Sequence, residues 1–78
     1  MKLSIRFTGR TNFIVFNDVV HFSKIAYSTY HVVLKHSTHN NQIQHIPSDC
    51  ILVKGIDDDE HVASAAITRV EEFNIKGE

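Results

Sequence analysis

Short apolar segments separated by polar turns run through the first 54 residues, and this pattern favours a sheet. Leu3, Ile5 and Phe7 alternate with polar residues, which is the period of a half-buried strand. Residues 9–12 have the composition of a turn, because Gly and Asn tolerate the backbone conformations that turns require. The continuous apolar run at 13–16 suits a second strand. Together the two segments predict a hairpin.

Three further segments predict strands. Residues 30–36 alternate with one apolar face and contain mainly residues that favour sheets. Residues 43–46 and 50–54 are shorter apolar segments, which end at Pro47 and Gly55 respectively.

The segment 19–28 is compatible with two structures. Its β-branched and aromatic residues favour a strand. A helix is the alternative, because Asp18 could cap it and Val19, Phe22 and Ala26 would then share one face.

The last part of the chain predicts a helix over about residues 59–74. The carboxylates of residues 57–60 suit a helix N-terminus. Apolar residues follow at helical spacing, namely Val62, Ala66, Val70 and Phe73. We therefore expect one α+β domain over residues 1–78. Its strongly bent antiparallel sheet or small barrel of about five short strands is followed by one C-terminal amphipathic helix.

The size of the chain limits what it can be. A chain of 78 residues buries one thin core, and its single Cys50 leaves no intramolecular disulfide and no Cys-rich zinc site. No apolar run has the ~18 residues of a membrane span, and charges at residues 2, 6 and 10 argue against a signal peptide. We expect an intracellular, cytoplasmic protein with no membrane attachment and no cofactor.

Charge is divided unevenly along the chain. Residues 1–54 hold six Lys or Arg and two Asp, a balance of +4, whereas residues 55–78 hold two Lys or Arg and seven Asp or Glu, a balance of −5. Such a division can steer a charged partner toward one part of the surface. Alternatively, the two parts simply face each other or the solvent.

The histidines offer a metal-binding alternative. If Asn40 and Asn41 formed a two-residue turn, His36 and His45 would lie opposite each other on one sheet face. Two imidazoles could share a transition-metal ion, but a lasting zinc site needs further ligands that the pattern does not supply. We therefore predict no metal ligands.

No segment carries a catalytic motif. Cys50 lies in an apolar segment beside Asp49, whose charge would raise the pKa of the thiol and oppose thiolate formation. The chain contains neither a G-x-S-x-G sequence nor a glycine-rich phosphate loop. We expect a protein that is not an enzyme.

Basic and aromatic residues of the first part are the candidate partner-binding residues, namely Arg6, Arg10, Lys24, Tyr27, Tyr30 and Lys35. We expect a small regulatory or inhibitory module that occupies the surface of a protein partner. Nucleic-acid binding is the alternative, because small sheet domains stack bases on aromatic residues in a basic groove. The sequence pI of about 6.6 favours the protein partner. Accessory proteins of phages or mobile elements are the expected source class.

The run at 13–16 also bears on assembly. It is uncharged and free of Pro, so as a sheet edge it would invite pairing with another chain. A homodimer would cover it. In a monomer, segment 19–28 would have to pair with it instead.

Overall fold

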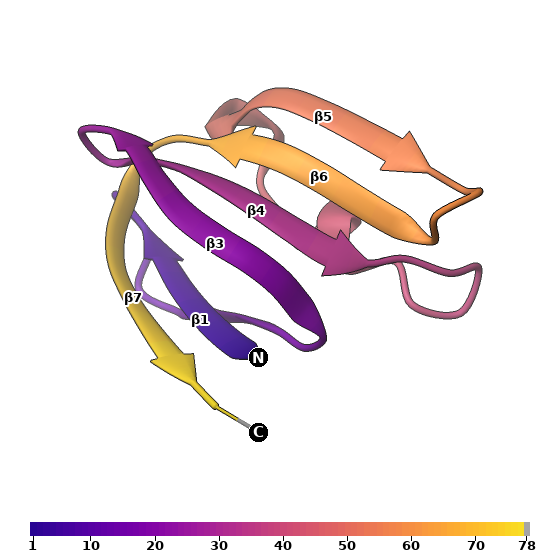
Figure 1. The fold of residues 1–78 in the computed structure, drawn as a ribbon. Helices are drawn as coiled ribbons and strands as arrows, with labels where there is room; N and C mark the ends of the chain where they lie inside the picture. The colour runs from indigo at the N-terminus through magenta and orange to yellow at the C-terminus, as the bar shows by residue number, and fades with distance from the viewer. Residues whose placement is uncertain (78) are drawn as a thin grey trace.

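The computed structural model describes residues 1–77 and shows an all-β domain of two antiparallel sheets (Figure 1). The smaller sheet, in the order β2-β1-β7, contains β1 (Lys2–Phe7), β2 (Ile14–Phe16) and β7 (Val70–Lys76). The larger sheet, in the order β3-β4-β6-β5, contains β3 (Val19–Ala26), β4 (Thr29–Lys35), β6 (Val62–Ile67) and β5 (Ile51–Asp57). The predicted antiparallel pairing is confirmed, but the predicted α+β class is wrong, and seven strands in two sheets replace the expected single bent sheet or barrel of about five.

β1 is the central strand of the smaller sheet, and its predicted alternation is confirmed. Leu3, Ile5 and Phe7 are fully buried in the core between the sheets. β2 pairs with β1 as the expected hairpin, and the alignment of Leu3 with Phe16 brings a second buried aromatic side chain into the same core.

The segment 19–28, for which the sequence leaves two structures open, contains a strand. β3 pairs along its length with β4, which confirms the strand predicted over residues 30–36. Turns bound β3 at both ends, because Asp18 and Ser28 adopt left-handed backbone conformations with φ of 58° and 55°. A helix cannot continue through either residue.

The strand predicted at 43–46 is wrong, and the facing arrangement of His36 and His45 is wrong with it. Residues Gln42–His45 form the short 3-10 helix η1, and Ser48–Cys50 form a second, η2. Ile43 and Ile46 are both buried, so a spacing of three residues turns one face of this segment toward the core. No helix among residues 1–77 has the length and apolar character needed to cross a membrane.

A buried glutamine links this helical segment by hydrogen bonds to the turn between β2 and β3. The side-chain amide of Gln42 donates to the carbonyl of Asn17 at 2.7 Å, and its oxygen accepts from the Asn17 N–H. Gln42 is buried, so these two bonds satisfy a polar group that would otherwise destabilise the core.

The C-terminal helix predicted over residues 59–74 is wrong. β6 and β7 occupy this part of the chain, joined by a turn at which Arg69 has a φ of 62°. The acidic residues form the turn between β5 and β6 instead of a helix N-terminus. In that turn the Asp57 carboxylate accepts a hydrogen bond from the Glu60 N–H at 3.2 Å.

Pairing with distant strands explains why this segment is not helical. β6 lies between β4 and β5, and its alternate residues Ala63, Ala65 and Ile67 are buried. Ala63 is aligned with Leu34 on one side and Ile56 on the other, so a small side chain fits between two large ones. These tertiary contacts outweigh the helical propensity of alanine.

The two sheets approach each other along β3 and β7, a line that we call the seam. At one end of the seam, the Val70 N–H donates to the carbonyl of Ser28. Met1 and Val19 exchange two further main-chain hydrogen bonds of 2.8 and 2.9 Å, but these join the start of β3 to the start of β1 and lie outside the seam. Within residues 1–77, β3 forms a ladder only with β4 and β7 only with β1, so the middle of the seam has no ladder.

Substitution of two phenylalanines tests this core. Phe7→Ala removes a fully buried ring, and we expect it to lower the free energy of unfolding by about 3–5 kcal/mol. Phe13→Ala removes a half-exposed ring just before β2 and serves as the matched control, with an expected change well below that of Phe7→Ala. Urea unfolding measures both. Equal losses for the two variants would contradict the described core.

Candidate functional site

Three aromatic rings fill the middle of the seam. The rings of Phe22 and Tyr30 are stacked, with centroids 4.7 Å apart and planes inclined by 1°. The ring of Phe73 meets both of them edge-on, with centroid distances of 5.2 Å. The cluster therefore joins β3 and β4 of one sheet to β7 of the other, in geometries that aromatic pairs prefer.

Strand register places these rings on the inner faces of the sheets. Phe22 is aligned with buried Val32, and Phe73 is aligned with buried Ile5. At the seam the inner face is not covered, because no further strand of the described chain continues either sheet there. Phe73 consequently keeps 40% of its surface exposed although it points inward.

Exposed side chains lie next to this cluster on β3, on the turn after β3 and on β7. Tyr27, in the turn after β3, is 89% exposed, and the Lys24 ammonium lies 6.0 Å from the centre of its ring. Ile75 is also exposed and lies on the same face of β7 as Phe73, two residues away. We call this group the seam surface; it consists of Phe22, Lys24, Tyr27, Tyr30, Phe73 and Ile75.

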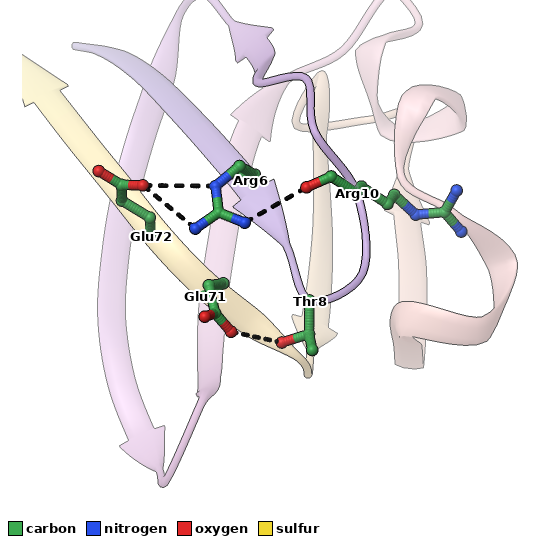
Figure 2. Close-up of polar contacts among 5 residues, drawn as sticks. All are labelled: Arg6, Thr8, Arg10, Glu71 and Glu72. Carbon is green, nitrogen blue, oxygen red and sulfur yellow. Dashed lines mark hydrogen bonds and ion pairs between the residues drawn. The ribbon is translucent and has the colours of Figure 1, made fainter.

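Polar contacts link β1 to β7 on the outer face of the smaller sheet (Figure 2). The Arg6 guanidinium donates two hydrogen bonds to one carboxylate oxygen of Glu72, at 3.3 and 3.2 Å, and a third to the carbonyl of Arg10. The Thr8 hydroxyl donates to Glu71 on the same strand as Glu72. The charge of Arg6 on β1 is thus balanced by Glu72 on β7, so this part of the chain's charge division is used within the molecule.

A second group of charges surrounds the start of β5. Asp49 accepts one hydrogen bond from Arg10 at 3.2 Å and one from Arg69 at 3.3 Å. The neighbouring Cys50 is buried. Burial raises the pKa of its thiol, and the adjacent Asp49 carboxylate raises it further. This cysteine is therefore held as a neutral thiol and is unsuited to nucleophilic chemistry.

Lys35 lies at the opposite end of β4 from Tyr30, beside a hollow of about 450 Å³. Asp18 and His61, both in left-handed conformations, line this hollow and accept main-chain hydrogen bonds from Lys35 and His36 through their carbonyl groups. The hollow also contains Glu60, so carboxylates and basic side chains are mixed in it. This mixture of charges does not define one class of ligand.

The six predicted partner-binding residues therefore fall into two groups. Lys24, Tyr27 and Tyr30 come together on the seam surface. The other three lie elsewhere: Arg6 on the outer face of the smaller sheet, Arg10 beside Asp49, and Lys35 beside the hollow.

Two residues of β7, Phe73 and Ile75, belong to the seam surface although the sequence does not predict them there. The reason is that the spacing of apolar residues favours a helix over this segment. The signal that could have found them is their alternation with polar residues in Val70–Lys76.

Residues 1–77 contain no preformed metal site. Among residues 1–77, no three His, Cys, Asp or Glu side chains are grouped so that they could hold a metal ion. His36 lies instead near Asp58, with 3.7 Å between the imidazole Nε2 and a carboxylate oxygen.

Comparison of the chain with protein-family models, with curated proteins and with solved structures found no match. Its function is therefore inferred from the surfaces of the molecule.

The buried thiol gives a chemical test of the site around β5. We expect Cys50 to react slowly with iodoacetamide at about pH 8 in the folded protein and at the rate of a free cysteine in guanidinium chloride. Because the pKa of this thiol is raised in the folded state, the free energy of unfolding should fall as pH rises above the ordinary pKa of a cysteine. Cys50→Ala should abolish this part of the pH dependence. Equal alkylation rates in the two states would contradict the described burial.

Proposed function

We propose that this chain is a non-enzymatic protein-binding module that uses the seam surface to occupy a site on its partner, as a small regulator or inhibitor does. The observation that supports the proposal is the exposure of large apolar side chains where β3 and β7 lie near each other without forming a ladder. Tyr27 and Phe73 are the most informative, because exposed aromatic side chains are typical anchors of protein interfaces.

The arrangement of the seam surface also favours protein binding energetically. Phe22, Tyr30 and Phe73 hold one another in fixed geometry, so little conformational entropy is lost when a partner covers them. Lys24 adds a positive charge at the edge of this surface. The expected partner surface combines apolar side chains with a carboxylate placed to meet Lys24.

Binding of single-stranded nucleic acid is the second candidate. The exposed ring of Tyr27 beside Lys24 is the kind of arrangement on which a base can stack. Two of the predicted partner-binding residues, Arg6 and Arg10, donate instead to the carboxylates of Glu72 and Asp49. These ion pairs reduce the positive charge available to a phosphate backbone, which favours the protein partner.

Peptide selection tests the proposal. We would select ligands from a phage-displayed random peptide library and measure their affinity for variants by titration calorimetry. Tyr27→Ala is expected to weaken binding about tenfold or more, as truncation of an interface anchor does. Ile75→Glu is expected to do the same by placing a charge on the seam surface.

The matched control is Val15→Glu, on the edge strand β2, because Val15 is 43% exposed and Ile75 is 45% exposed. This control should bind the selected peptides like the parent chain. Selected peptides that bind all three variants equally would contradict the proposal. Salt-dependent binding of an oligo(dT) strand that Tyr27→Ala abolishes, with no peptide selected, would support the nucleic-acid candidate instead.

A further inference from the structure

β5 is the one long sheet edge that nothing in the described chain protects. Each of the two sheets has two edge strands. β2 has only three residues, while β3 and β7 approach each other through the rings of Phe22 and Phe73 and through the bond from Val70 to Ser28. β5 has seven residues, pairs only with β6, and forms the outermost strand of the larger sheet (Figure 1). An edge of this length offers a row of main-chain groups that can pair with another strand.

The side chains of β5 are unusually apolar for a free edge. Leu52 is 60% exposed and Val53 is 68% exposed, and Ile56 is also exposed farther along the strand. Such a combination of open main chain and apolar side chains is rarely left uncovered in a protein that stays monomeric at high concentration.

The two ends of β5 carry opposite charge. Close to its first residue, Arg10 and Arg69 share the single carboxylate of Asp49, which leaves one positive charge in excess. The turn that follows its last residue contains the carboxylates of residues 57–60. The ends of a seven-residue strand are about 23 Å apart, so this separation of charge extends over the whole strand.

We propose that β5 pairs antiparallel with β5 of a second copy of this chain, so that two four-stranded sheets join into one. Antiparallel pairing about a twofold axis places the acidic turn of each copy beside the arginine end of the other. Parallel pairing would instead place the two acidic turns together, which like-charge repulsion disfavours.

Lys54 restricts the register of this pairing. It lies in the middle of β5 on the face toward the core, because it is aligned with buried Ala65. A register that opposes the two copies of Lys54 is disfavoured by like charge. A register centred on Gly55 instead places each Lys54 across from Ile56 of the other copy, so the two lysines become diagonal neighbours and no longer face each other directly, and Asp58 lies on the other diagonal.

Sedimentation velocity across roughly a hundredfold range of protein concentration tests the proposal, because a dimer that forms by mass action dissociates on dilution. We expect a monomer–dimer equilibrium for the parent chain. Val53→Glu should weaken the dimer at least tenfold, because it places a carboxylate on the exposed apolar edge. Val15→Glu, the same change on the edge strand β2, should leave the dimer intact.

Two charge reversals test the orientation of the pairing. Lys54→Glu and Asp58→Lys should each weaken self-association, whereas an equimolar mixture of the two variants should form a heterodimer. In that heterodimer the introduced carboxylate of one variant meets the introduced ammonium of the other, and the unchanged Lys54 meets the unchanged Asp58, so both contacts are attractive.

Three outcomes would overturn the proposal. The first is a parent chain that is monomeric throughout the concentration range. The second is a dimer that Val15→Glu dissociates as readily as Val53→Glu does. The third is a mixture of the two charge-reversal variants that associates no better than either variant alone.

Discussion

The pairing of β7 with β1 is the interaction on which the rest of the structure depends. It aligns the two ends of the chain, from Lys2 with Lys76 to Phe7 with Val70, and so completes the sheet in which β1 is central. The same ladder brings the acidic face of β7 onto Arg6 and the aromatic ring of Phe73 onto the opposite sheet. A helical C-terminus would provide none of these contacts.

A chain of this size has enough residues to fill one core but too few to cover every strand edge. One approach between its sheets, the seam, has a main-chain bond at one end and is filled in the middle by aromatic rings. The edge of β5 is left without a covering segment among residues 1–77. The two proposed interactions use these two places, and they are independent because they involve different strands.

Local alternation predicts structure well where it is unambiguous, as in β1 and β4. It fails over residues 59–74 because Val62, Ala66 and Val70 suit a helix while Ala63, Ala65 and Ile67 suit a strand, and only pairing with β4 and β5 decides between them. The proximity of Lys24, Tyr27 and Tyr30 can be predicted because they are close in sequence. The proximity of Phe73 cannot, because its position beside Phe22 depends on a ladder between the two ends of the chain. The use of the uneven charge cannot be predicted from the sequence either, since Arg6 faces Glu72 only after β1 and β7 have paired.

Cross-strand nuclear Overhauser effects between β1 and β7 test this account most directly. We expect main-chain proton contacts at the aligned pairs Ser4–Asn74 and Ile5–Phe73, together with ring-proton contacts between Phe73 and Phe22. The same spectra should show extended backbone shifts through β6 and β7. Strong sequential amide contacts and contacts between residues three apart through residues 62–74, with no contact to β1, would contradict the account.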